Sequence, residues 1–264
     1  MKLQLFQVDA FAQRPFTGNP AAVCPLNEWP EDSLLQKIAQ ENNLSETAFF
    51  VPFKQGFRLR WFTPLKEVNL CGHATLACAH VLFTHLANLL NKNSTEIIFY
   101  SNSGELRVSQ TSKGLCLNFP SVASQEVIAP PPILAGLKDV TPIRVMAGSD
   151  YLVELESEQQ LMAVEPELSH WRKLDLRGVI LTAKATHYDF ISRCFFPKLG
   201  VNEDPVTGSA HCQLVPYWHK QLNQFQFHAL QASARSGQIN CELKGERVLL
   251  IGECVDYLIG EINV

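Results

Sequence analysis

The stretch WFTPLKEVNLCGHATLACAHVL, residues 61–82, has a counterpart later in the chain, CFFPKLGVNEDPVTGSAHCQLV, residues 194–215. Each runs from a predicted strand into Phe-x-Pro and through an irregular loop that contains an acid. A glycine, a polar residue and an alanine then open a predicted helix. Because these features occur in the same order, they indicate an internal duplication. The chain is therefore predicted to fold into two similar lobes, each with one sheet wrapped on one helix.

The segments around this repeat predict the rest of an α+β fold. Residues 73–90 are apolar on nearly every side, which is typical of a helix enclosed by a curved sheet, so its histidines, His80 and His85, are expected to be core residues with hydrogen-bond partners. Residues 30–43 predict an amphipathic helix with Leu34, Leu35 and Ile38 on one face. Strands and hairpins are predicted over 57–64, 96–120 and 241–264.

The domain boundaries are predicted from a proline-rich segment near the middle of the chain. Residues 129–142 have little periodic pattern and are the best candidate for a linker. An N-terminal lobe is predicted over 1–118 and a C-terminal lobe over 128–250. The terminal strand, 251–264, could belong to either lobe and could complete the first.

Composition excludes several classes of protein. Of the 264 residues, 46% are hydrophobic and 18% are charged, with a formal net charge of −4, so no basic stripe is available for nucleic acid. No apolar run approaches eighteen residues, and the N-terminus alternates like a strand, so neither a membrane span nor a signal peptide is predicted. The eight cysteines are scattered without ligand-like spacing, which favours reduced thiols in the cytoplasm and no metal site.

The two repeated loops are candidates for substrate binding. Gly72 and Gly208 would let the backbone approach a bound molecule, and the amides that follow would form helix N-termini that favour a carboxylate or phosphate. Two such ends would hold a small anionic substrate. The alternative is that both are ordinary turn glycines, with Ser209 as a helix N-cap.

Glu46 is the candidate for the chemistry. If NNLSETAFFV, residues 42–51, is a strand, Glu46 shares a face with Leu44, Ala48 and Phe50. A carboxylate on an apolar face is costly to ionise, which suits it to take up and release a proton near neutral pH. The alternative is a glutamate at a strand end with its carboxylate in water.

Four blocks together resemble the PhzF-type, phenazine biosynthesis-like isomerase family. They are DAFAQRPFTGNPAAVC (9–24), LSETAFF (44–50), FTPLKEVNLCGHATLA (62–77) and EDPVTGSAHCQLVPYW (203–218). The resemblance implies a diaminopimelate epimerase-like fold, with two similar lobes that each wrap a curved sheet or barrel around a central helix. It also implies an active site in the cleft between the lobes, and no metal or organic cofactor.

The resemblance assigns roles to individual residues. The glutamate that moves a proton in the family falls on Glu46, and the residues that line the substrate pocket fall on His73, Asp204 and Ser209. Gly72, Gly208 and Thr207 are included with the substrate-binding residues. Asn19, Cys71 and Arg235 are further possibilities, although a solvated turn arginine is the favoured alternative for Arg235.

The cysteine pattern bears on a related chemistry. Related epimerases use two cysteines, one per lobe, each just before the glycine. This chain has Cys71 at the first such position and Thr207 at the second, so a two-thiol racemase is incomplete and Cys71 is expected to be a packed thiol.

Three functions are consistent with these residues. The preferred one is a cofactor-independent isomerase that moves a proton on a small, carboxylate-bearing metabolite, with Glu46 as the general acid/base. The alternatives are a thiol-dependent racemase that uses Cys71 and a non-catalytic metabolite-binding protein. Edge strands on such lobes commonly pair between subunits, so a homodimer is also expected.

Overall fold

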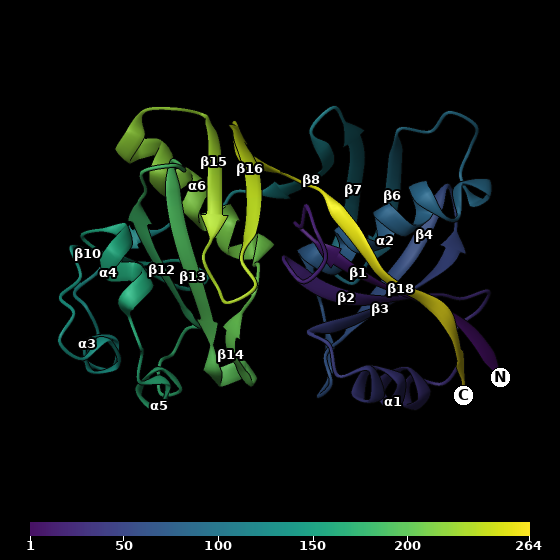
Figure 1. The fold of residues 1–264 in the computed structure, drawn as a ribbon, viewed down its shortest axis with the longest axis horizontal. Helices are drawn as coiled ribbons and strands as arrows, with labels where there is room; N and C mark the ends of the chain where they lie inside the picture. The colour runs from purple at the N-terminus through teal and green to yellow at the C-terminus, as the bar shows by residue number, and fades with distance from the viewer. The chain divides into compact units, whose positions relative to one another are not determined.

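The computed structural model describes all residues, Met1–Val264, and the chain divides into two compact units. The first unit combines Met1–Asn118 with Ile251–Val264, and the second unit is Phe119–Leu250. Figure 1 shows the elements of each unit by label.

The strands of the first unit surround the helix α2 (Gly72–Thr84), which contacts β1, β2, β3 and β18. A surface helix, α1 (Asp32–Asn42), and a short 3₁₀ turn at Ala87–Leu89 complete the unit. Its strands are β1 (Lys2–Ala10), β2 (Asn19–Pro25), β3 (Glu46–Phe53), β4 (Gly56–Phe62), β5 (Glu67–Val68), β6 (Glu96–Ser101), β7 (Gly104–Thr111), β8 (Gly114–Pro120) and β18 (Cys254–Asn263).

The second unit is built around α6 (Gly208–Leu222), which packs on β16. Its shorter helices are α3 (Pro131–Leu137), α4 (Glu158–Ala163) and α5 (Leu168–Trp171), with a 3₁₀ turn at Pro197–Leu199. Its strands are β9 (Gln125–Glu126), β10 (Arg144–Ala147), β11 (Tyr151–Glu154), β12 (Val179–Lys184), β13 (Phe190–Phe196), β14 (Val201–Asp204), β15 (Gln226–Gln231), β16 (Gly237–Lys244) and β17 (Arg247–Gly252).

The two units share one strand topology. In the first, β1 pairs antiparallel with β2, β2 parallel with β3, and β3 antiparallel with β4. The strand β4 then pairs antiparallel with β5 and parallel with β6, which pairs antiparallel with β7. Strands β10 to β16 repeat these pairings in the same order and sense. The predicted α+β class with two similar units is confirmed.

The central helix of the first unit is as apolar as predicted but shorter. It begins at Gly72 and ends at Thr84, and between Ala74 and Leu82 only His80 is not fully buried. The predicted face of α1 is also confirmed, because Leu35 and Ile38 are buried and Leu34 packs against the same core cluster.

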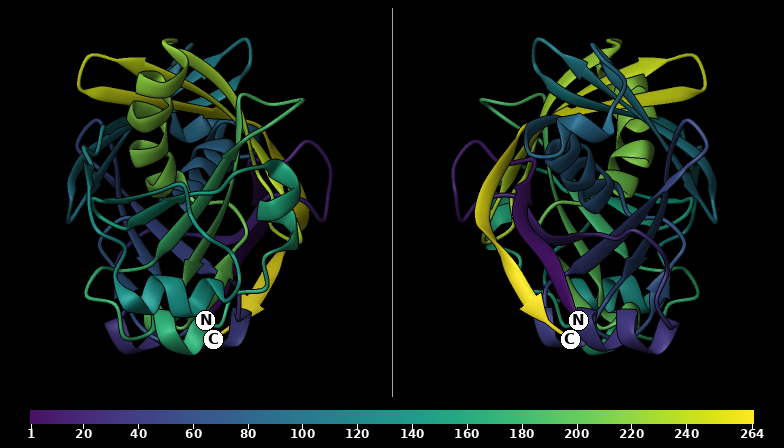
Figure 2. Two further views of the ribbon diagram at one scale, coloured as in Figure 1. Left: turned by 90° about the vertical axis from the view of Figure 1, so that its left-hand side faces the viewer. Right: turned by 90° about the vertical axis from the view of Figure 1, so that its right-hand side faces the viewer.

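The strand β18 lies in the first unit, along β1. The two pair antiparallel from Lys2↔Asn263 to Ala10↔Cys254, and the backbones of Met1 and Val264 are hydrogen bonded to each other. Figure 2 shows the two chain ends side by side. The last residues of the sequence therefore complete the same unit as the first.

The predicted linker at 129–142 is wrong. Pro131–Leu137 forms α3, with Pro130 as its N-cap residue, and Ile133 and Leu137 are buried in the core of the second unit. Proline is well tolerated in the first turn of a helix because the first amides have no acceptor within the helix. The prolines therefore start a helix here instead of marking a boundary.

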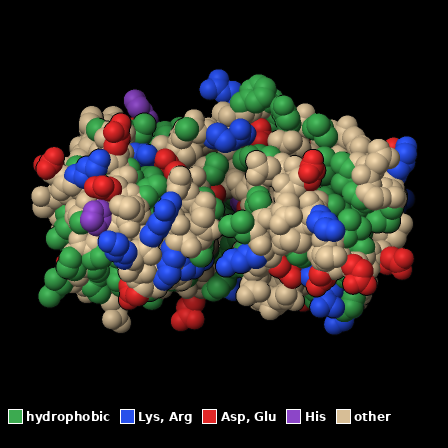
Figure 3. Space-filling model, turned by 90° about the horizontal axis from the view of Figure 1, so that it is seen from below, with side chains coloured by type: hydrophobic (Ala, Val, Ile, Leu, Met, Phe, Trp, Pro, Cys, Tyr) green, Lys and Arg blue, Asp and Glu red, His purple; other side chains and the backbone are tan.

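Charges of both signs are mixed on the molecular surface. On the face drawn in Figure 3, Lys and Arg side chains are interspersed with Asp and Glu side chains. None of the helices combines the length and the apolar composition needed to cross a bilayer.

Candidate active site

Four candidate residues of the first unit come together from three elements. Glu46 is the first residue of β3, and Asn19 is the first residue of the neighbouring strand β2. His73 is the second residue of α2, and Cys71 is the N-cap residue of that helix. The four therefore meet where α2 begins.

His73 is the centre of this cluster. Its Nε2 lies 3.1 Å from Glu46 Oε2, and its Nδ1 lies 3.2 Å from Asn19 Nδ2 and 3.5 Å from Cys71 Sγ. Because an amide NH₂ can only donate, the contact with Asn19 makes Nδ1 an acceptor, which places the proton of neutral imidazole on Nε2. That nitrogen is close to Glu46 Oε2 but does not form a hydrogen bond with it.

Gly18 fixes the position of Asn19. It has a φ of +69°, and a Cβ at this position would collide with the carbonyl oxygen of Ala10 on β1. Only glycine permits both this conformation and this close approach. The turn between β1 and β2 therefore delivers Asn19 to the imidazole of His73 at a fixed place.

The carboxylate of Glu46 is largely buried. Its side chain is 18% exposed, and the side chain of His73 is 6% exposed. Oε2 is buried and accepts no hydrogen bond, although His73 lies beside it. A buried carboxylate oxygen without a hydrogen bond is costly, so such an atom is suited to take a proton from a bound molecule.

The equivalent loop of the second unit places Asp204, Thr207 and Gly208 together. Asp204 ends β14, Thr207 is the N-cap residue of α6, and Gly208 is the first residue of that helix. The hydroxyl of Thr207 donates to Asp204 Oδ2 at 2.5 Å. Thr207 thus has the position in α6 that Cys71 has in α2, since each is an extended residue directly before the helical glycine.

Gln231 organises this loop, although no sequence motif points to it. Its side-chain NH₂ donates to the backbone oxygen of Asp204 at 2.7 Å and to Thr207 Oγ1 at 3.1 Å. Its carbonyl oxygen accepts from the backbone N–H of Thr207 at 2.7 Å. The available signal was alternation along β15, where Phe227, Ala229 and Gln231 point inward and only Gln231 is polar.

Ser209 differs from expectation in its position at the start of α6. Ser209 is not the N-cap of α6, because the helix begins one residue earlier at Gly208 with Thr207 in that role. Ser209 instead lies half-buried in the first turn. Arg235 is half-buried in the turn between β15 and β16, near the turn residues Ser233 and Ser236, which are joined by hydrogen bonds.

His211, in the first turn of α6, is a buried titratable group that was not among the predicted site residues. Its Nδ1 lies 2.8 Å from the backbone oxygen of Thr207, and because a carbonyl only accepts, Nδ1 carries the proton. Nε2 is buried without a hydrogen-bond partner. Burial lowers the pKa of His211 to about 4, although the bond to Thr207 opposes this. His211 is therefore a neutral imidazole.

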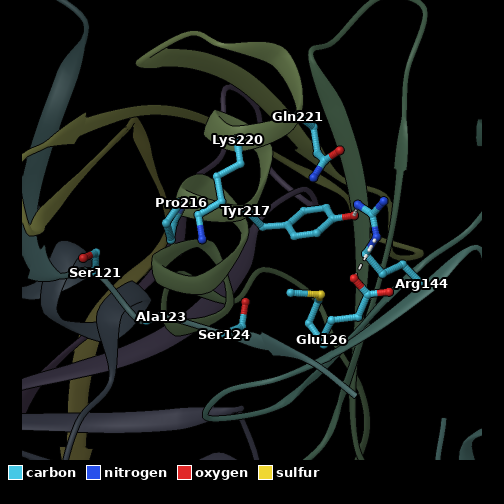
Figure 4. Close-up of a pocket in the computed structure, with 10 residues that line it drawn as sticks. Ser121, Ala123, Ser124, Glu126, Arg144, Pro216, Tyr217, Lys220 and Gln221 are labelled. Carbon is cyan, nitrogen blue, oxygen red and sulfur yellow. Dashed lines mark hydrogen bonds and ion pairs between the residues drawn. The ribbon is translucent and has the colours of Figure 1, made fainter. Parts of the chain in front are cut away.

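The second unit also contains a hollow that none of the predicted site residues line. Its volume is about 370 Å³, and α6 contributes Pro216, Tyr217, Lys220 and Gln221 to it (Figure 4). Across it, Arg144 donates to the hydroxyl of Tyr217 at 3.2 Å and lies 3.6 Å from Glu126. The charges of Arg144 and Glu126 thus pair across the hollow, and Lys220 is the remaining charged residue of its lining. Ser121, Ala123, Ser124 and Met146 complete its lining.

Two groups of side chains have the donor atoms and spacing to hold a metal ion. Glu46, Cys71 and His73 offer one oxygen, one sulfur and one nitrogen within 4.8 Å of one another. His80, His85 and Asp256 offer two nitrogens and one oxygen at the same spacing. Only the first group coincides with the candidate site.

Comparisons with known proteins agree with this architecture. The model of the family described as phenazine biosynthesis-like protein matches residues 8–259. A protein of Halalkalibacterium halodurans that is named an uncharacterized isomerase is 48% identical, over 99% of each chain. A crystal structure of an Enterococcus faecalis protein of the PhzF family covers 100% of both chains at 43% identity, with a TM-score of 0.95.

A more distant structure shows how far the fold extends. A hydroxyproline epimerase from Agrobacterium vitis is similar over 99% of this chain and 92% of that one, with a TM-score of 0.65 and 10% identity. At this identity the similarity concerns the fold alone, which is the epimerase-like fold that the sequence predicted. The family model and the relatives of 43–48% identity go further, and they show that the chain belongs to the phenazine biosynthesis-like (PhzC/PhzF) family of isomerases.

Proposed function

We propose that this chain is a cofactor-independent isomerase that moves a proton on a small, carboxylate-bearing metabolite, with Glu46 as the general acid/base. The observation that carries the proposal is the buried Oε2 of Glu46, which accepts no hydrogen bond and lies 3.1 Å from His73 Nε2. A buried carboxylate oxygen that lacks a hydrogen bond is stabilised when it takes up a proton, so Glu46 is suited to remove one from a bound carbon acid.

His73 orients this carboxylate and stabilises its charge. The contacts of Asn19 and Cys71 with Nδ1 hold the ring in place, and Nε2 faces Glu46. When Glu46 is ionised, the imidazole N–H lies beside the charge, and when Glu46 is protonated, the imidazole can remain neutral. The proton can therefore leave one carbon and return to another without a change in the charge of His73.

Residues of the second unit are proposed to bind the substrate. Asp204 is fixed through its carboxylate by Thr207 and through its backbone by Gln231, so its charge keeps a defined direction. Gly208 and Ser209 begin α6, whose first amides favour an anionic group. Gly72 begins α2 in the same way.

The test is proton exchange in heavy water. Small-molecule extracts incubated with the enzyme in D₂O are expected to show deuterium uptake in one metabolite, read by mass spectrometry. Glu46→Gln keeps the size of the side chain but replaces the carboxyl group with an amide that cannot take up or release a proton. Deuterium uptake is therefore expected to fall by about a hundredfold or more while the protein stays folded. Glu28→Gln, at an exposed position, is the matched control and should exchange at the wild-type rate. Undiminished exchange in Glu46→Gln would end the proposal.

A second candidate is a thiol-dependent racemase. It is favoured by one observation, the 3.5 Å separation of Cys71 Sγ and His73 Nδ1, since a neighbouring imidazole can remove a thiol proton. Thr207 at the equivalent position of α6 argues against it. Cys71→Ser separates the two functions: full deuterium exchange excludes the thiol mechanism, and loss of exchange with Glu46→Gln still active supports it.

A further inference from the structure

A second cluster of titratable side chains lies in the first unit where β18 contacts α2. His80 Nε2 lies 3.0 Å from Asp256 Oδ1, and His85 Nε2 lies 2.8 Å from Asp256 Oδ2. Both imidazoles therefore converge on one carboxylate, and they come from a different chain segment than the carboxylate does. The expected hydrogen-bond partners are present, but both side chains are only partly buried, so these histidines are not core residues.

A β-bulge aims Asp256 at the histidines. Along the pairing of β1 with β18, Gln7 is opposite Leu258 and Val8 is opposite Asp256, so the register skips Tyr257. Such a bulge redirects side chains on the strand that carries the extra residue, and bulges are common beside functional sites. The carboxylate of Asp256 thus points at α2 because of an irregularity that strand pairing itself does not require.

The duplicated unit shows that the fold does not require these histidines. When α6 is aligned on α2 from the first helical glycine, Pro216 falls at the position of His80 and Gln221 at that of His85. The helix of the second unit packs without an imidazole at either position. The two histidines are therefore a property of the first unit and not of the repeated architecture.

The cluster is enclosed on one side and open to water on the other. The side chains of His80, His85 and Asp256 are 17%, 24% and 33% exposed. Phe6 of β1 stacks on His85, with 5.3 Å between ring centres. A small ion can reach these atoms from solvent.

We propose that His80, His85 and Asp256 form a site for a divalent transition-metal ion of the zinc type. Two imidazole nitrogens and one carboxylate oxygen are a common zinc donor set, with water as a further ligand. Metal–ligand bonds of about 2.0–2.1 Å in tetrahedral geometry require nitrogen–oxygen separations of about 3.3 Å. His80 and His85 lie 3.0 and 2.8 Å from different oxygens of Asp256, and the candidate donor atoms all lie within 4.8 Å of one another, so small side-chain rotations would bring them to this spacing. On binding, each neutral imidazole changes tautomer, so that Nδ1 carries the proton and the lone pair of Nε2 faces the ion.

The bound ion would tie β18 to α2. Without the ion, the histidines are joined to β18 by two hydrogen bonds to the partly exposed carboxylate of Asp256. Coordination replaces them with bonds that hold helix and strand to one centre, so the metal should stabilise the strand that completes the first unit.

The experiment uses tag-free, chelator-treated protein titrated with Zn²⁺ by calorimetry and with Co²⁺ by visible absorption. One equivalent of Zn²⁺ is expected to bind, with Co²⁺ giving ligand-field bands in the same stoichiometry. His85→Gln can keep a hydrogen bond to Asp256 and should fold, and it is expected to weaken binding by more than about tenfold. His80→Gln provides a second test of the same kind. Hydrogen exchange in β18 should slow with Zn²⁺ in the wild type and not in His85→Gln.

Controls separate this site from other donors. Cys71→Ser removes a ligand from the other candidate group, and His170→Gln removes a surface imidazole that pairs only with Glu167. Both should bind Zn²⁺ like the wild type. The proposal is overturned if the wild type binds no Zn²⁺ at millimolar concentration, if His80→Gln and His85→Gln both bind it unchanged, or if Cys71→Ser is the variant that loses it.

Discussion

Asp204 is held by hydrogen bonds to both its carboxylate and its backbone oxygen. Its carboxylate accepts from the hydroxyl of Thr207, and its backbone oxygen accepts from the side chain of Gln231. Pro205 follows, which restricts the backbone of Asp204 to extended conformations. The direction of its negative charge is therefore set before any substrate binds.

Asp204→Asn tests whether that charge binds substrate or only shapes the loop. Asparagine can still accept from Thr207, so the loss of stability should be only about 1 kcal/mol. A hydrogen bond to a charged group contributes about 1.5–3 kcal/mol, so turnover should fall ten- to a hundredfold. Thermal melts and deuterium exchange measure the two effects. Thr207→Val, which removes the hydroxyl and keeps the charge, is the control, and normal exchange in a destabilised Asp204→Asn protein would show that the loop is scaffold.

His211 predicts an acid sensitivity. Its pKa is lowered to about 4 in the folded protein, against an ordinary value of 6.5 in the unfolded chain. Below pH 6.5 the unfolded chain therefore binds a proton that the folded protein does not, so stability is lost as the pH falls from about 6.5 to about 4. Between pH 7 and pH 5 this residue should contribute a loss of about 2 kcal/mol.

Urea unfolding at the two pH values measures this loss. His211→Gln should be less stable at pH 7 but should show a smaller decrease toward pH 5 than the wild type. His187→Gln, at an exposed position, should retain the full decrease. An identical pH dependence in wild type and His211→Gln would contradict the assignment.

The residues that could be predicted from sequence are those in local blocks. Glu46, His73 and Asp204 each lie within a short stretch whose order of residue types is distinctive. Gln231 was missed because its partners, Thr207 and Asp204, lie 24 and 27 residues earlier in the chain. Contacts of this kind depend on how β15 pairs with β13, which residue types alone do not reveal.

At the scale of elements, α6 carries an interior proline that connects it to another segment. Pro216 has no N–H, so the carbonyl of Cys212, four residues earlier, has no helical donor. That carbonyl instead accepts from the backbone N–H of Val122 at 2.9 Å. The proline therefore frees an acceptor that holds the segment between β8 and β9.

Pro216→Ala tests this connection. Alanine restores an N–H that competes with Val122 for the oxygen of Cys212, so the amide of Val122 should exchange with solvent at least several-fold faster. Hydrogen exchange of peptides covering residues 119–126 measures this. Gln221→Ala, on the same helix and without effect on that carbonyl, should leave exchange unchanged. Unaltered exchange in Pro216→Ala would mean that Val122 keeps its acceptor.

Helices can be predicted from a strong pattern of apolar residues, but amino-acid composition alone is a weaker basis for prediction. The helix after Gly72 was found from its uniform apolarity, but its end at Thr84 depends on the 3₁₀ turn that follows. The segment 129–142 resembles a linker in sequence, because prolines without periodicity are typical of linkers. The buried partners of Ile133 and Leu137 lie in distant strands, so nothing local indicated a packed helix.

At the scale of the whole molecule, the first unit is made of two pieces of chain. The strand β18 pairs with β1 over nearly its full length, and Met1 and Val264 are hydrogen bonded. Repetition of the strand order in the second unit could be inferred from the paired motifs at 61–82 and 194–215. Which unit contains the terminal strand could not, because its alternation fits either sheet.

A rearranged chain tests whether β18 is an integral part of the first unit. Residues 251–264 placed before Met1 and joined to it by a short turn would form a hairpin, because the two strands are antiparallel and their ends are adjacent. This single-unit protein, ending at Asn118, is expected to be monomeric and to melt cooperatively. Residues 1–118 alone should aggregate or remain unfolded, and equal behaviour of the two proteins would show that β18 is dispensable.

The position of β18 also orders events during synthesis. A ribosome makes the eight strands of the first unit early, yet the partner of β1 emerges only after all of Phe119–Leu250 has been translated. At about 5–20 residues per second, the edge of β1 stays unpaired in the nascent chain for roughly 7 to 30 seconds. An unpaired edge strand is a template for aggregation, so trigger-factor-like or Hsp70-like chaperones would find their main binding opportunity on this protein within that interval.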